Sequence, residues 1–122
     1  MNTFKYYQNI NDLKTIDYTV ILSNKLETEK DLIAELAIKL NFPKYFSYNW
    51  DSLYDCLRDL SWIEARSITI VHSDLPKLND IDLKIYLEVL MDSLNEWIDD
   101  DIHDFYIFFP KKYFKKIDIL ME

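Results

Sequence analysis

Three short runs of apolar, β-branched and aromatic residues divide the chain: residues 18–22 (YTVIL), 67–71 (SITIV) and 105–109 (FYIFF). Residues that are apolar at successive positions are typical of strands in parallel sheets, which are covered on both faces. Between these runs, apolar residues recur every three or four positions, as in helices with one buried face. The order of strand, two helices, strand, helix and strand predicts a small α/β domain. We expect a three-stranded parallel sheet packed with helices through right-handed crossovers.

Favourable N-cap residues mark the starts of the first two predicted helices. Thr28 precedes a helix that we expect to run to about Asn41, because Pro43 then stops it. Asn49 precedes a second helix, which we expect over about residues 50–60.

A third helix is expected to start at Asp80 or Asp82 and to reach about Ile98. Its apolar residues share one face that should pack on the core. These residues are Leu83, Leu87, Leu90, Leu94 and Trp97. The terminal segments, residues 1–16 and 110–122, show weaker patterns, and we expect them to add an extra helix or an edge segment.

The composition fits one packed domain over residues 1–122, with its core at about 18–109, because 49% of the residues are hydrophobic and 16% aromatic. Glycine is absent, so turns that need a positive φ must use Asn, Asp or Ser. The chain shows neither an apolar run long enough to span a membrane nor the apolar segment of a signal peptide. Its one cysteine, Cys56, has no internal partner. We therefore expect a cytoplasmic protein.

The formal charge of −8 is concentrated in residues 74–104, which hold ten acidic residues and only two lysines. Such a surface repels nucleic acid and anionic lipid and attracts a basic partner. We therefore expect neither nucleic-acid nor membrane binding. Charge alone, however, favours the plainer interpretation that acidity keeps the protein soluble.

Candidate catalytic and metal-binding groups are few, so we expect no enzyme activity, no cofactor and no metal. Phosphate-binding loops need glycine, which the chain lacks. We expect His72, at the end of a predicted strand, to be a half-buried structural residue. Neighbouring acids should raise the pKa of Cys56, which we interpret as a packing residue. The cluster from Asp99 to Asp104, which includes His103, offers ligands for a hard cation. Its spacing matches no EF-hand loop and supplies no glycine turn, and a solvated loop is favoured.

One acidic row needs a further explanation. If residues 50–60 form one helix, Asp51, Asp55 and Asp59 share a face and repel one another. Aromatic residues surround the row, and Tyr and Trp beside charges are typical of protein-binding hot spots. They are Tyr45, Phe46, Tyr48, Trp50 and Tyr54. Carboxylates in a row can occupy the phosphate positions of a nuclease's substrate and meet its Arg and Lys residues. Composition and spacing leave this interpretation evenly balanced against a generic acidic surface.

Residues 43–62, PKYFSYNWDSLYDCLRDLSW, resemble the signature of barstar-like proteins, the intracellular inhibitors of barnase-type ribonucleases. The shared pattern is a Pro, an aromatic pair, a small residue, then Asn, an apolar residue, Asp, and the run Asp-Cys-Leu. The predicted order of strands and helices agrees with that family over about residues 18–109. The resemblance implies a small barstar-like domain that blocks a ribonuclease active site with its second helix and the preceding loop.

The resemblance also implies roles for individual residues. Asp55 matches the family's dominant hot spot in the phosphate site, and Tyr54 stands where the family has a tryptophan. Trp62 is expected to be either a flanking aromatic or a core residue, and Asp92 is the candidate for a further acid on the last helix. Together with the acidic row, the expected partner-binding residues are Tyr45, Asn49, Asp51, Tyr54, Asp55, Asp59, Trp62 and Asp92.

Two departures from the family pattern point to a different partner enzyme. Ser47 replaces a glycine that is common before the Asn, and Tyr48 adds bulk at the same edge. We expect a stoichiometric inhibitor, a monomer when free, that gives immunity to a basic ribonuclease toxin. The alternatives are an interaction module of the same fold with a partner that is not a ribonuclease, and a metal-dependent enzyme that uses the cluster from Asp99 to Asp104.

Overall fold

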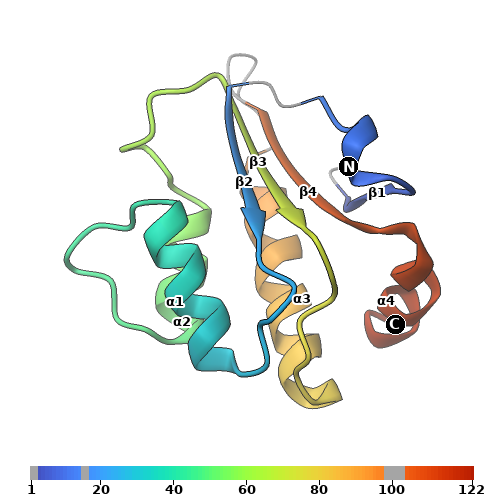
Figure 1. Ribbon diagram of the computed structural model, residues 1–122. Coiled ribbons are helices and arrows are strands. Elements are labelled where there is room, and N and C mark those ends of the chain that lie inside the picture. Colours follow the sequence, from blue (N-terminus) through green and yellow to red (C-terminus); the bar gives the residue numbers. More distant parts are fainter. Residues whose placement is uncertain (1–2, 15–16, 98–103) are drawn as a thin grey trace.

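Four parallel strands form one sheet in the computed structural model, which describes residues 3–14, 17–97 and 104–122 (Figure 1). The strands are β1 (Lys5–Tyr7), β2 (Tyr18–Leu22), β3 (Ser67–His72) and β4 (Asp104–Pro110), in the order β1-β4-β3-β2. The predicted α/β fold with a parallel sheet is confirmed, and the three predicted strands are β2, β3 and β4. The fourth strand, β1, pairs only three residues with β4, which is too short for a pattern in the sequence to reveal.

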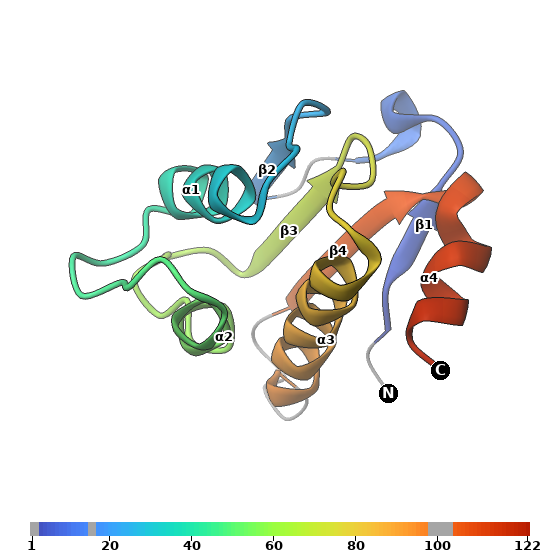
Figure 2. The ribbon, with the colours of Figure 1, turned by 90° about the horizontal axis from the view of Figure 1, so that it is seen from below.

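The helices gather mainly on one side of this sheet. They are α1 (Glu29–Lys39), α2 (Trp50–Leu57), α3 (Asp80–Glu96) and α4 (Phe114–Leu120), with short 3-10 helices η1 (Ile10–Asp12) and η2 (Lys111–Tyr113). Figure 2 shows α1, α2 and α3 on the same side of the strands, and α4 beside β1. Phe114 of α4 meets Tyr6 of β1 edge-on, with ring centroids 5.1 Å apart. The C-terminal segment therefore does add a helix, and the N-terminal segment an edge strand.

The core lies between the sheet and these helices. Alternate strand residues point into it and are buried; they are Val20, Leu22, Ile68, Ile70, Phe105, Ile107 and Phe109. The predicted stripe of α3 is buried against them through Leu83, Leu87, Leu90 and Leu94. Trp97, just past the end of α3, is half-buried and packs on Phe105 at 5.2 Å.

The opposite face of the sheet differs from the expectation that both faces are covered. Its strand residues include Thr19, Ser67, Thr69 and Tyr106, which line an open groove together with residues of β1, η1 and the neighbouring loops. No residue of the four α-helices lines that groove. The apolar runs suggested burial on both sides because hydroxyl-bearing Thr and Tyr are also strong strand formers.

The predicted N-caps Thr28 and Asn49 are confirmed, and all three predicted helices end earlier than expected. The Thr28 hydroxyl accepts the Asp31 N–H at 3.1 Å. As predicted, α3 starts at Asp80, and Asn79 is its N-cap. Positive φ angles occur at Asp17 and Asn41, as the absence of glycine predicted, but also at Leu60 (49°). The left-handed turn at Leu60 explains why α2 stops at Leu57 instead of near residue 60. The turn costs a leucine about 1–2 kcal/mol, which burial of its side chain offsets.

His72 is fully buried, rather than half-buried as expected, and joins three elements of the core. Its Nδ1 donates to the Phe108 carbonyl of β4 (2.9 Å), so Nε2 accepts from the Tyr86 hydroxyl of α3 (2.6 Å). The ring also stacks on Phe109 with centroids 3.9 Å apart. Burial lowers the pKa of His72 to about 4, which keeps the ring neutral. His72 is therefore a structural group and not a general base.

Acid should destabilise the fold through His72. Its ordinary pKa of 6.5 applies in the unfolded chain, and the folded value is about 4. The unfolded state therefore binds the extra proton first, and stability falls as the pH drops from 6.5 to 4, by on the order of 3 kcal/mol. Urea unfolding of the wild type and His72→Gln across this range isolates the effect, because carboxylates titrate in both proteins. The variant should be less stable at pH 7 but should lack this pH dependence, and equal pH dependence in both would contradict the assignment.

Candidate protein-binding site on α2 and α3

The loop before α2 is held by its own aromatic cluster and by the cap of the helix. Phe46 is buried and meets Phe42 and Tyr48 edge-on, with ring centroids 4.7 and 4.9 Å away. The Asn49 side chain accepts the N–H of Ser52 at 2.8 Å. These contacts anchor the loop from inside, while Tyr45 and Tyr48 remain 66% and 64% exposed.

Ser47 fits this loop without backbone strain. It is not among the described residues with positive φ, and its N–H donates to the Ser52 hydroxyl at 3.0 Å. The hydroxyl of Ser52, in the first turn of α2, therefore holds the loop at Ser47. This is the position at which the resemblance to barstar-like proteins implies a glycine.

The acidic row is present, but one member is off the helix. Asp51 and Asp55 lie exposed on α2, whereas Asp59 lies beyond its end in the turn that leads to Leu60. Asp59 nevertheless stays with the group, because it lines a hollow of about 310 Å³ together with Glu96 of α3. Tyr45 faces the same acids. Partial desolvation raises the pKa of its hydroxyl, and the neighbouring Cys56, Asp59 and Asp55 add to the rise.

Tyr54 connects α2 to α3. Its hydroxyl donates to Glu96 Oε1 at 3.0 Å across 42 positions of the sequence. This hydrogen bond is the main reason that the pKa of Tyr54 is raised, followed by partial burial and the charge of Glu96; Asp92 adds to the rise and Arg58 opposes it. The structure thus places Asp92 near Tyr54, and the role of Asp92 in partner binding stays a prediction. It also adds Glu96, which the sequence analysis missed although it lies one helical turn after Asp92.

Arg58 is the only basic side chain that contacts this group among the described residues. Its guanidinium lies 3.2 Å from Asp55 Oδ1 and 5.1 Å from the centre of the Tyr54 ring. Both side chains of the ion pair are about half exposed, so the pair contributes little to stability. A single guanidinium therefore faces a surface with five carboxylates, which are those of Asp51, Asp55, Asp59, Asp92 and Glu96. We call this the α2–α3 surface, and it also includes Tyr45 and Tyr54.

Trp62 lies at the border of this region, and its side chain contacts other residues of the protein. Its indole N–H donates to the Leu40 carbonyl at 2.9 Å, and its ring meets Phe42 edge-on at 6.0 Å. Of the two roles expected for it, these contacts favour packing. A role in partner binding stays a prediction.

The described residues contain neither a cluster suited to bind a metal ion nor a helix suited to span a membrane. There, no group of three or more His, Cys, Asp or Glu side chains is arranged to hold a metal ion. Most of the cluster from Asp99 to Asp104, including His103, lies outside the described residues. None of the helices in the described ranges combines the length and apolar character needed to cross a membrane.

The thiol of Cys56 should be unreactive in the folded protein. Its side chain is fully buried on the inner face of α2, and burial, with Asp55 and Asp59, raises its pKa to about 11. Reaction with a thiol reagent such as DTNB at pH 8 should be slow in buffer and rapid in urea. Because Cys56 is the one cysteine, the signal has a single source, and rapid labelling of the native protein would contradict this assignment.

Comparison with known proteins agrees with the sequence motif. The family model described as Barstar (barnase inhibitor) matches residues 18–110, from the start of β2 to the end of β4. Searches among curated proteins and among solved structures found no match. The family match includes α2, its preceding loop and α3, which carry the acidic surface. Because it also covers most of the chain, the chain belongs to the barstar family.

Proposed function

We propose that this protein inhibits a ribonuclease by covering its active site with α2, the preceding loop and the neighbouring part of α3. The observation that carries the proposal is the α2–α3 surface, where exposed carboxylates outnumber one guanidinium, and the exposed Tyr45 and the half-buried Tyr54 stand beside them. A ribonuclease active site holds Arg and Lys residues for the phosphates of RNA, and carboxylates satisfy the same donors. The inhibitor acts by occlusion and performs no chemistry of its own.

Each part of the surface has a role in this proposal. Asp55 enters the phosphate site, and Asp51, Asp59 and Asp92 meet surrounding cations. The tyrosines provide rigid apolar area that excludes water around the charge pairs, as hot-spot surroundings do. Trp62 has a supporting role at the border, and Asn49 keeps the contact loop on the start of α2. The net charge of −8 steers a basic enzyme toward the inhibitor at low salt.

The biological setting follows from this chemistry. A cell that makes or receives a ribonuclease toxin must protect its own RNA, so we infer that the inhibitor acts in the cytoplasm, as a monomer that forms a one-to-one complex. A barstar-fold module with a partner other than a ribonuclease remains the alternative. A pull-down from the native host separates the two, because it identifies the bound protein.

Replacing Asp55 by Ala should strongly weaken inhibition. The change leaves enzyme cations buried without a partner, and we expect a loss of at least roughly 2 kcal/mol. That size is taken from hot-spot residues, for which barstar's own aspartate is a standard example. The measurement is a titration of a barnase-type ribonuclease by the wild type and by Asp55→Ala, at low and high salt, with RNA cleavage as the readout.

Glu27→Ala is a matched control, because Glu27 is an exposed acid outside the α2–α3 surface. It should inhibit like the wild type. Stoichiometric inhibition that weakens with salt and with Asp55→Ala alone supports the proposal. A loss for Asp55→Ala below about 1 kcal/mol with an enzyme that the wild type does inhibit would contradict the assigned site.

Replacing Arg58 by Gln should speed association with the same basic enzyme. In the free protein Arg58 forms an ion pair with Asp55 and offsets part of the negative potential at the surface. The partner's cations must displace it, so its removal should raise the association rate at low salt by roughly two- to tenfold. Stopped-flow mixing measures this rate. A slower association would mean instead that Arg58 contacts the enzyme directly.

A further inference from the structure

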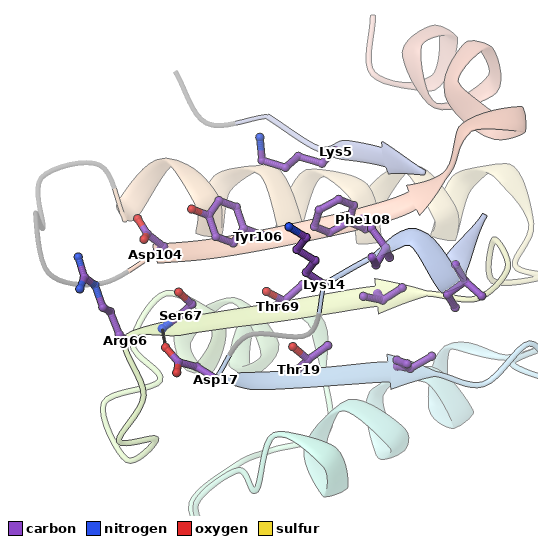
Figure 3. A pocket seen from close by; sticks show the side chains of 14 residues that line it. Lys5, Lys14, Asp17, Thr19, Arg66, Ser67, Thr69, Asp104, Tyr106 and Phe108 are labelled. Atoms are coloured by element: carbon purple, nitrogen blue, oxygen red, sulfur yellow. Dashed lines mark hydrogen bonds between the residues drawn. The ribbon is translucent and has the colours of Figure 1, made fainter. Parts of the chain in front are cut away.

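The face of the sheet opposite α1–α3 holds a groove of about 680 Å³, which has no role in the proposed inhibition. This volume is within the roughly 300–1,000 Å³ of small-molecule sites. We call it the sheet groove. Figure 3 shows its lining, with side chains from β1, β2, β3 and β4 and from the segment before β2.

Strand register arranges the floor of the sheet groove in three rows, because strands are parallel and in-register side chains lie side by side. At the start of the strands, Ser67 pairs with Asp104, and the Ser67 N–H donates to Asp17 Oδ2 at 3.1 Å. The middle row carries hydroxyl groups, and the row toward the ends of the strands is apolar. The middle row is Thr19, Thr69 and Tyr106, and the apolar row is Ile21, Val71 and Phe108.

Two lysines stand over this floor. Lys5 of β1 is in register with Phe108, at the edge of the apolar row, and its ammonium lies 5.7 Å from the centre of the Tyr106 ring in the middle row. Lys14 reaches over the sheet from the segment before β2 (Figure 3). Within the described part of the chain, neither lysine has an acidic side chain within salt-bridge distance. In a protein with a net charge of −8, two cations left without carboxylates beside an apolar row are a local excess of positive charge.

The acids of the groove do not neutralise these lysines. Asp17 is held at the far end by the backbone of Ser67, and Asp104 lies in the same row, where Arg66 also lines the groove. From that end to the other, the lining changes from carboxylates and a guanidinium, through hydroxyls and ammonium groups, to apolar side chains. Ile10 and Leu13 add apolar area to the groove from η1 and the residue after it.

We propose that the sheet groove binds a small amphipathic anion, with its charged head at the two lysines and its apolar part on the apolar row. The hydroxyls of Thr69 and Tyr106 lie in the row between these parts and can donate to a carboxylate head. Charge and shape together define the ligand. A cation would be repelled by the lysines, and a fully polar anion would leave the exposed Ile21 and the half-buried Phe108 of the apolar row uncovered, whereas Val71 between them is already buried. This inference does not depend on the proposed ribonuclease inhibition.

The test is a titration of the full chain with octanoate, followed by amide chemical shifts. Saturable, one-to-one changes should appear in β2, β3 and β4, and amides of α2 should stay unchanged. Octanamide, which has the same chain without the charge, should bind more weakly. The double variant Lys5→Gln/Lys14→Gln should weaken octanoate binding by roughly tenfold, and it should leave octanamide binding unchanged.

Two further variants make the outcome decisive. Lys84→Gln, an exposed lysine on α3, is the matched charge control and should bind octanoate like the wild type. Thr69→Trp fills the middle of the groove and should abolish binding of both compounds. The idea fails if octanoate gives no saturable shifts up to about 10 mM, or if the shifts map to another surface. It also fails if the double lysine variant binds octanoate as well as Lys84→Gln does.

Discussion

The packing of α2 against α3 is the contact on which the α2–α3 surface depends. A helix of eight residues is not stable alone in water, and two aspartates one turn apart cost it a few tenths of a kcal/mol. Complete burial of Leu53 and Leu57 is worth roughly 1.5–3 kcal/mol for each side chain. Burial on the inner face therefore outweighs repulsion on the outer face, and α2 can carry like charges that do not contribute to folding.

Both ends of α2 are fixed by contacts that a continuous helix would not need. Asn49 satisfies a free N–H at the first turn. At the other end, the indole N–H of Trp97 donates to the Leu57 carbonyl at 3.1 Å, which supplies a partner for one of the carbonyls left free where a helix ends. Because Tyr54 also bonds to Glu96, α3 holds α2 both at its end and on its side. The packing of these two helices therefore sets the position of the acids relative to Tyr45 and Tyr54.

The sequence predicted those features that arise from local burial patterns. Strands β2, β3 and β4 and the buried stripe of α3 follow from which residues avoid water, and the caps Thr28 and Asn49 follow from local hydrogen bonding. The family motif identified the fold and named the acids of α2. That those acids bind a ribonuclease is part of the proposed function.

Features that depend on contacts distant in sequence were missed. The short strand β1 exists because β4 offers a free edge. The chain turns away from α2 at Leu60, where burial of the side chain offsets the energetic cost of the left-handed backbone. Glu96 belongs to the α2–α3 surface because the fold places it beside Tyr54, a contact that the sequence does not reveal. The open face was unexpected because Thr and Tyr suit a strand whether or not anything covers it.

Charge is divided between the two sides of this fold. The helix side carries the acids of the α2–α3 surface, and the sheet side carries two lysines that have no acidic side chain within salt-bridge distance among the described residues. Interactions between exposed charges are largely screened beyond about 10 Å at 0.1 M salt, and the sheet and its core lie between these surfaces. The helix side can therefore attract positively charged ligands and the sheet side negatively charged ones, although the whole molecule is acidic. The sequence showed that the acids are concentrated in residues 74–104, and the strand register and the one-sided packing of the helices separate the acidic surface from the two lysines.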